Sequence, residues 1–149
     1  RNEATVIAKV EAPGSHSVAT WVGKRIDVHC TSLGKCLIAY LSPAEVERIT
    51  SEHGLLRHNE NTVVSLPELR RELARVRKLG YAVDDEEEEL GMRCIGVPVF
   101  DKEGRVLAAI SVSGTTEQIH EGNYEQIRER LLETARLISE RLTLAAETR

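Results

Sequence analysis

A pair of apolar segments joined by a short turn constrains the fold of this chain most strongly. Residues 92–100 and 105–113 are rich in β-branched and small apolar residues, and the linking Asp101-Lys102-Glu103-Gly104 ends in glycine. Such a pattern is typical of an antiparallel hairpin. Because side chains alternate between the two faces of a strand, one face is expected to enter the core with Ile95, Val97, Val99, Ile110 and Val112.

The remaining pattern predicts helices packed on an antiparallel sheet. Further strands are expected at 5–13, 16–22, 25–30 and 81–84, and helices at 32–41, 43–53, 66–79 and 121–145. Capping boxes at Ser42–Glu45 and Ser65–Glu68 mark two helix starts, and Gly54 and Gly80 mark two ends. Strands before and after a central helical block indicate an α+β fold with a GAF/PAS-like outline. All of residues 1–149 are assigned to one domain. The last helix is expected to bury Tyr124, Ile127, Leu131, Ala135, Ile138 and Leu142.

The second face of the hairpin carries small, mildly polar residues. Cys94 and Gly96 lie on one strand, and Ser111 and Ser113 lie on its neighbour. Such a face leaves room for a small molecule and offers it a few directed hydrogen bonds. The alternative is a face that is exposed to solvent or packed under a helix.

A second candidate site lies at the start of the first predicted helix, in Thr31-Ser32-Leu33-Gly34-Lys35. Unpaired backbone amides at a helix N-terminus attract anions, and glycine permits close approach, so a carboxylate would suit this position. The alternative is an ordinary capped helix. The upstream glycine and spacer of a nucleotide-binding P-loop are missing, which excludes ATP binding.

Metal binding and catalysis are weaker alternatives. The acidic run at residues 84–89 lacks the alternating ligands and central glycine of a calcium loop, so a solvated loop is expected, with Asp84 able to turn toward the pocket. His29, Asp84 and Cys94 together could hold a transition metal. Cys94 and His29 could act as nucleophile and base, although a lone strand cysteine is more often a small buried apolar residue.

Composition limits the partners and the compartment. Lys and Arg number 20 against 24 acidic residues, and aromatic residues make up 3%; DNA binding by this chain alone is therefore not expected. No apolar run approaches the roughly 20 residues that cross a bilayer. Three cysteines without C-x-x-C spacing indicate free thiols in the cytoplasm. Since the chain begins at Arg1 without Met, a further domain upstream is expected.

Four segments together resemble the effector-binding domain of IclR-type bacterial transcriptional regulators. They are Ile26-Asp27-Val28-His29-Cys30-Thr31-Ser32-Leu33-Gly34-Lys35-Cys36-Leu37-Ile38-Ala39, the helix and Gly-Tyr-Ala strand of 69–85, Gly91-Met92-Arg93-Cys94-Ile95-Gly96-Val97-Pro98-Val99, and Ala108-Ala109-Ile110-Ser111-Val112-Ser113-Gly114. Their order and spacing match over most of residues 16–145. Asp27, where many members have proline, and Asn59, where threonine is common, depart from the pattern.

The resemblance implies a sensor that binds a small carboxylate and has no cofactor or catalytic residue. DNA would be bound only through an N-terminal winged helix-turn-helix domain absent from this chain, and the protein would be a homodimer or homotetramer. By position, the effector site would combine apolar walls, helix amides and polar side chains. These residues are Ile26, Met92, Ser32, Leu33, Gly34, Asp84, Cys94, Ser111 and Ser113.

Overall fold

The central element is an antiparallel sheet of three strands in the order β3-β4-β5. In the computed structural model, which describes residues 3–14 and 20–147, these strands are β3 (Ala82–Asp85), β4 (Met92–Phe100) and β5 (Val106–Thr115). The predicted hairpin is confirmed, with Ile95 paired to Val112 across it. Val112 was expected in the core but is 43% exposed, because the residues packed on this face reach Ile110 and not Val112. Its turn is closed by Asp101, whose carboxylate accepts the backbone amides of Glu103 and Arg105.

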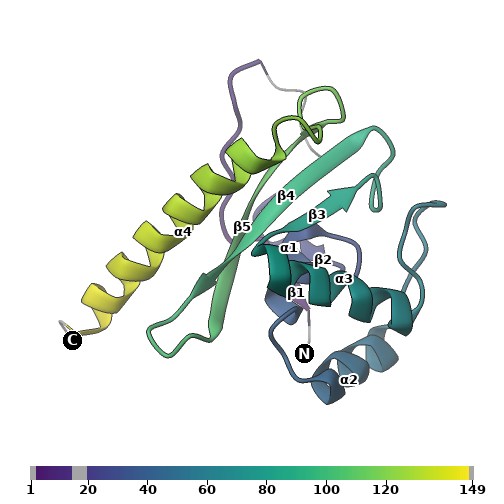
Figure 1. Ribbon diagram of the computed structural model, residues 1–149, viewed down its shortest axis with the longest axis horizontal. Helices are drawn as coiled ribbons and strands as arrows, with labels where there is room; N and C mark the ends of the chain where they lie inside the picture. The colour runs from purple at the N-terminus through teal and green to yellow at the C-terminus, as the bar shows by residue number, and fades with distance from the viewer. Residues whose placement is uncertain (1–2, 15–19, 148–149) are drawn as a thin grey trace.

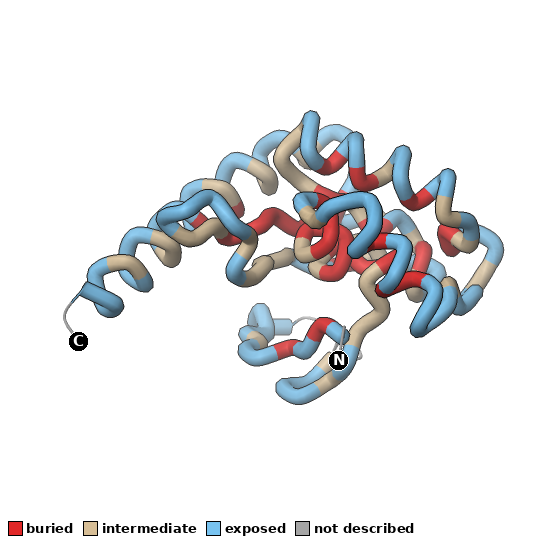
Figure 2. Tube along the Cα trace, turned by 90° about the horizontal axis from the view of Figure 1, so that it is seen from below, coloured by how far each residue is buried: buried red, intermediate tan, exposed pale blue. Residues whose placement is uncertain are grey.

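Helices cover both faces of this sheet (Figure 1). The long α4 (Tyr124–Glu147) packs on the face of Ile95, Val97 and Val99, where it buries Leu131 and Ala135. The opposite face carries α1 (Ser32–Ile38), and α2 (Pro43–His53) and α3 (Leu66–Leu79) pack around it. Figure 2 shows the buried residues concentrated between these layers. The α+β fold expected from the sequence is confirmed.

The helix signals predicted the boundaries well. Ser42 and Glu45 form a reciprocal capping box at α2, and Ser65 accepts the amide of Glu68 at α3. Gly80 ends α3 in the left-handed conformation, at φ 80°. The first helix is shorter than expected, because it ends at Ile38 instead of Leu41.

The end of α4 differs from the prediction. Leu142, expected on the buried stripe, is 45% exposed, because this part of the helix extends beyond the sheet that covers Leu131 (Figure 1). Within the described residues, no helix has both the length and the apolar character needed to cross a bilayer.

The predicted N-terminal strands are mostly wrong. Only β1 (Ala4–Thr5) and β2 (Arg25–Ile26) pair, and they form a separate two-stranded ribbon. Val6 is still buried and pairs with Lys24 and Gly23 through its backbone, but Ile7 and Val10 are 80% and 96% exposed. The apolar pattern after Val6 therefore meets no second layer. The predicted strand at 16–22 lies largely outside the described residues, and residues 20–22 are not in a strand. Residues 28–30 form a turn, which leads into α1.

Candidate functional site

Three predicted site residues form one row across the sheet. Cys94 on β4 is paired with Asp84 on β3 and with Ser113 on β5. Directly paired residues point to the same face, so the three side chains share the α1 side of the sheet. The Ser113 side chain lies close enough to the Cys94 thiol to lower its pKa in part. The structure therefore brings together polar side chains that lie up to 29 residues apart.

The next row brings the start of α1 onto the same face. Gly96 is paired with Ser111, and a Cβ atom at Gly96 would lie 3.1 Å from the backbone carbonyl of Ser32. A side chain at this position would therefore crowd the start of the helix. The two stretches that the sequence singled out, the small polar hairpin face and the helix start, meet at this contact.

The helix start offers fewer amides than expected. The Gly34 amide donates to the side chain of its own N-cap residue, Thr31, at 3.1 Å. The first amides of a helix have no acceptor within the helix, so Ser32 and Leu33 remain as candidates. Ser32 is 2% exposed, and Leu33 is half-buried.

Burial changes along the row. Asp84 is 3% exposed, Cys94 is half-buried, and Ser113 is exposed; Ser111, in the next row, is half-buried. Solvent therefore reaches the row from the β5 side, while the β3 end is closed. One Asp84 oxygen accepts the amides of Glu87 and Glu88, at 2.9 and 3.4 Å. Burial raises the Asp84 pKa to about 6, although these hydrogen bonds and the positive charge of Lys35 act to lower it.

Cys94 is poorly suited to act as a nucleophile. Burial raises the pKa of its thiol to about 12; the Ser113 side chain lowers it only in part, and the charge of Asp84 raises it further. Because the thiolate is the reactive species, a raised pKa works against a catalytic role for this thiol.

The two apolar residues predicted for the site occupy different places. Met92 is half-buried and lies two residues before Cys94, on the same face of β4. Ile26 lies in β2, paired with Ala4. The chain that follows Ile26 passes against α1, since a Cβ at Gly34 would lie 2.4 Å from the Val28 Cα. Ile26 is thus near the helix start, but it is not part of the sheet that holds the row.

The acidic run is only partly a solvated loop, and this corrects the sequence interpretation. Glu87 is 6% exposed and pairs with the fully buried Lys35, whose Nζ lies 2.5 Å from its carboxylate. Thr62 donates to the Glu87 carbonyl at 2.7 Å and Asn59 donates to that of Glu86 at 2.9 Å. The missed signal was Lys35 itself, because a lysine among apolar helix residues needs a buried counter-charge.

The alternative metal set is also wrong. His29 is buried, and its Nε2 lies 3.0 Å from the Leu56 carbonyl oxygen. In the described part of the chain, His29, Asp84 and Cys94 do not form a group of potential ligands. The group that does form consists of Asp27, Cys30 and His58.

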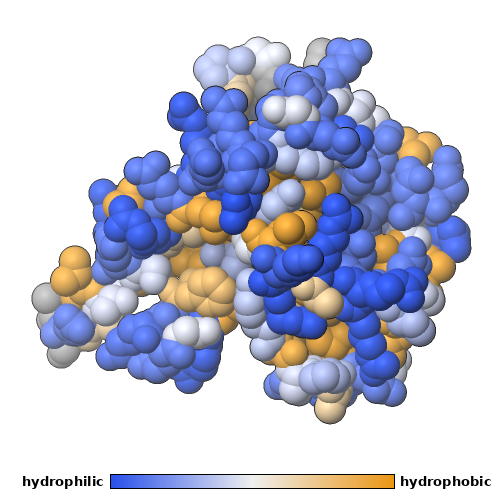
Figure 3. Space-filling model, viewed as in Figure 1, coloured by the Kyte–Doolittle hydropathy of each residue, from blue (hydrophilic) through white to orange (hydrophobic). Residues whose placement is uncertain are grey.

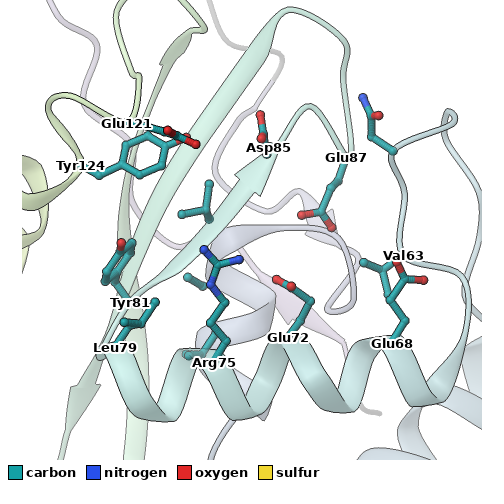
Figure 4. A pocket seen from close by; sticks show the side chains of 14 residues that line it. Val63, Glu68, Glu72, Arg75, Leu79, Tyr81, Asp85, Glu87, Glu121 and Tyr124 are labelled. Atoms are coloured by element: carbon teal, nitrogen blue, oxygen red, sulfur yellow. The ribbon is translucent and has the colours of Figure 1, made fainter.

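A cleft of about 390 Å³ lies elsewhere, along β3 and α3 (Figure 4). None of the predicted effector-site residues lines it. Its charged walls are mostly acidic and comprise Glu68, Glu72, Asp85, Glu87 and Glu121, with Arg75 as the one basic residue among the described residues that line it. Figure 3 shows the same face, with hydrophilic residues over α3 and hydrophobic ones in the hollow toward α4. An excess of carboxylates repels anions, so this cleft does not suit an organic acid.

Comparison with known proteins identifies the class of domain. The family model described as bacterial transcriptional regulator IclR C-terminal matches residues 1–140. The chain therefore belongs to the IclR family of transcriptional regulators and corresponds to its C-terminal regulatory domain.

Similar proteins support this assignment. The chain is 35% identical to the HTH-type transcriptional regulator XynR of Escherichia coli over 140 residues, which cover 94% of this chain and 56% of XynR. The chain thus spans about half the length of the curated relatives it matches. The crystal structure of Thermotoga maritima IclR matches with a TM-score of 0.89 and 35% identity over 95% of this chain and 57% of that one. The inducer-binding domain of a PobR double mutant from Acinetobacter, in complex with 3-hydroxybenzoic acid, matches with a TM-score of 0.82 and 27% identity, covering 92% and 81%.

Proposed function

We propose that this domain binds a small organic acid and thereby controls DNA binding by the regulator to which it belongs. The observation that carries the proposal is the contact between Gly96 and Ser32, which places the helix start beside the Asp84–Cys94–Ser113 row. One side of the site would supply amides for a carboxylate, and the other would supply hydroxyl and thiol groups for the rest of the ligand.

A carboxylate suits these groups better than a cation does. The amides of Ser32 and Leu33 and the hydroxyls of Ser111 and Ser113 can all donate hydrogen bonds to an anion. Asp84 is the acidic side chain of the site. Because its pKa is raised, a larger fraction of it is neutral than at an exposed aspartate, which weakens its repulsion of an anion. The PobR domain, whose solved complex contains 3-hydroxybenzoic acid, is a relative with an aromatic acid as ligand. In this site, Met92 and Ile26 would form the apolar walls.

Signalling would operate by population shift. The effector would stabilise one arrangement of α1 against the sheet, and this would bias the placement of an N-terminal winged helix-turn-helix domain outside this chain. A ligand can shift such a balance only by the difference between its affinities for the two states. We further propose a cytoplasmic homodimer or homotetramer, for which the exposed Leu137, Leu142 and Leu144 of α4 provide apolar surface.

A GAF-like enzyme acting through Cys94 is the second class of function to test. A sensor shows saturable binding and leaves its ligand unchanged, whereas an enzyme converts it. The raised pKa of Cys94 favours the sensor, since an activated cysteine has a lowered pKa.

A thermal-shift screen of small carboxylates tests the proposal. A ligand at about 100 times its dissociation constant adds roughly 2.7 kcal/mol to the free energy of unfolding, which raises the melting temperature by several degrees. The double variant Ser111→Ala/Ser113→Ala should weaken binding of a hit at least about tenfold with little loss of stability, because each hydroxyl removed is worth about 1 kcal/mol.

The matched control is Ser51→Ala, on the exposed face of α2 and remote from the row. It should bind like the unsubstituted chain. Unchanged affinity in the double variant would refute the placement of the site. Chemical conversion of the bound ligand would show that the domain is an enzyme and not a sensor.

A further inference from the structure

Three side chains with metal-binding atoms meet in front of α1, apart from the row described above. One ligand atom each of Asp27, Cys30 and His58 lies within 4.8 Å of the other two. We propose that these residues bind a zinc ion. Within residues 3–14 and 20–147, no other three His, Cys or acidic side chains are arranged in this way.

The backbone holds the three positions independently of their side chains. Asp27 and Cys30 flank the turn before α1, where the Thr31 hydroxyl donates to the Asp27 carbonyl at 2.6 Å. His58 follows α2 in a polar connection, and its amide donates to the Thr62 hydroxyl at 3.1 Å. The ligands are therefore brought together by the fold before any metal is bound, which lowers the entropic cost of binding.

The geometry requires only a small adjustment for an ion to bind. The Nε2 atom of His58 already lies 2.8 Å from an Asp27 carboxylate oxygen. Ligands at 2.0–2.3 Å from a tetrahedral zinc are roughly 3.5 Å apart, so the widest separation, at most 4.8 Å, closes by about 1 Å. Cys30 is fully buried, whereas the side chains of His58 and Asp27 are 26% and 42% exposed. The ion would thus have protein on one side and solvent on the other.

The donor set selects the metal. Thiolate, imidazole and carboxylate ligands suit zinc, whereas calcium and magnesium prefer oxygen alone. Three protein ligands leave the fourth position of a tetrahedral ion to water. When zinc binds, a Zn–S bond replaces the S–H bond of Cys30 and the proton passes to solvent. The carboxylates of Asp84, Glu87 and Glu88 lie close enough to act on the charge of Cys30, and they add attraction for a cation.

The test uses the 149-residue chain after treatment with a chelator. One equivalent of zinc per chain should bind in calorimetry and should raise the melting temperature. Cobalt(II) in place of zinc should give the charge-transfer absorption of a thiolate ligand, and Cys30→Ser should remove that absorption. Asp27→Asn and His58→Gln should each weaken zinc binding about tenfold or more, since losing even an outer-shell partner costs 10–100-fold.

Asp27 and His58 are partly exposed, so substitutions there should leave the domain folded. These two variants therefore test the proposal even if Cys30→Ser does not fold. The matched control is His53→Gln, an exposed histidine at the end of α2, which should bind zinc like the unsubstituted chain. Unchanged affinity in both Asp27→Asn and His58→Gln would overturn the proposal. So would a thiolate band that is lost in Cys94→Ser and kept in Cys30→Ser. Neither result bears on carboxylate binding, because that site uses other residues.

Discussion

The ammonium nitrogen of Lys35 lies 2.5 Å from a carboxylate oxygen of Glu87, and the lysine is fully buried. The same nitrogen donates to the Val83 carbonyl at 3.0 Å. This pair ties α1, which carries the proposed ligand-binding amides, to β3 and the loop that follows Asp84. The second Glu87 oxygen is buried and has no hydrogen-bond partner among the described residues. Because Lys35 lies in α1 and Glu87 follows β3, movement of α1 against the sheet would pull this ion pair apart.

Removing one partner should destabilise the domain strongly. Lys35→Met leaves Glu87 buried without its counter-charge, and such a loss typically costs about 3–5 kcal/mol. Glu72→Gln is the control, since Glu72 is 32% exposed at its side chain and 3.7 Å from the same ammonium; it should cost less than about 1 kcal/mol. Urea unfolding measures both. Equal stability of the two variants would show that the buried pair contributes no more than a surface contact.

Stability should fall as the pH rises through the acidic range. Burial raises the Asp84 pKa from 3.8 to about 6, so between these values the folded chain holds a proton that the unfolded chain releases. The contribution is therefore complete below pH 3.8 and is lost as the pH rises through about 6. It amounts to roughly 2–3 kcal/mol at 1.36 kcal/mol per pKa unit. Burial raises the Glu87 pKa as well, against the charge of Lys35, and adds a slope of the same sign.

Asp84→Asn isolates this contribution. The variant keeps an oxygen that can accept the Glu87 and Glu88 amides, and its unfolding free energy should vary less between pH 4 and pH 6, a window that follows from the Asp84 pKa. Urea unfolding at several pH values gives the comparison. If the two proteins showed the same slope, Asp84 would not be the titrating group.

The glycine at the start of α1 should tolerate no side chain. A Cβ at Gly34 would lie 2.4 Å from the Val28 Cα and 2.8 Å from the Asp27 carbonyl oxygen. Because both neighbours are backbone atoms, Gly34→Ala should lower the unfolding free energy by about 1–3 kcal/mol or more. Gly122→Ala is the control, since its Cβ would meet only the His120 side chain. Equal melting temperatures would mean that the segment before α1 is free to move away.

The three cysteines should react slowly while the chain is folded. Burial is the largest cause of the raised pKa of each thiol, to about 12 at Cys36 and Cys94 and higher still at Cys30. Labelling with a thiol reagent at neutral pH should therefore be slow in buffer and fast in denaturant. Cys94 is the informative residue, because it is only half-buried. Rapid labelling of Cys94 in the folded chain would revive it as a candidate nucleophile.

Local patterns predicted the centre of the fold and part of the site. The alternation of Ile95, Val97 and Val99 fixed which face of β4 meets α4, and therefore also placed Cys94 on the other face. Helix ends were predictable because glycines and capping serines act within a few residues. Both are short-range effects, so one sequence is sufficient to identify them.

Long-range contacts could not be predicted in this way. The ion pair of Lys35 with Glu87 joins residues 52 positions apart, and the His58–Asp27 pair spans 31. The apolar alternation of residues 5–13 resembles a strand, but a strand needs a neighbouring edge for pairing, and the structure provides one only as far as Val6. Periodicity indicates which face is apolar and not what covers it.

The most direct test of the sensor account is a crystal structure of this chain with the carboxylate that stabilises it most. We predict that the carboxylate lies at the amides of Ser32 and Leu33, with the remainder of the ligand against Cys94 and Ser113. A ligand bound instead in the acidic cleft beside Glu72 and Glu87 would contradict it.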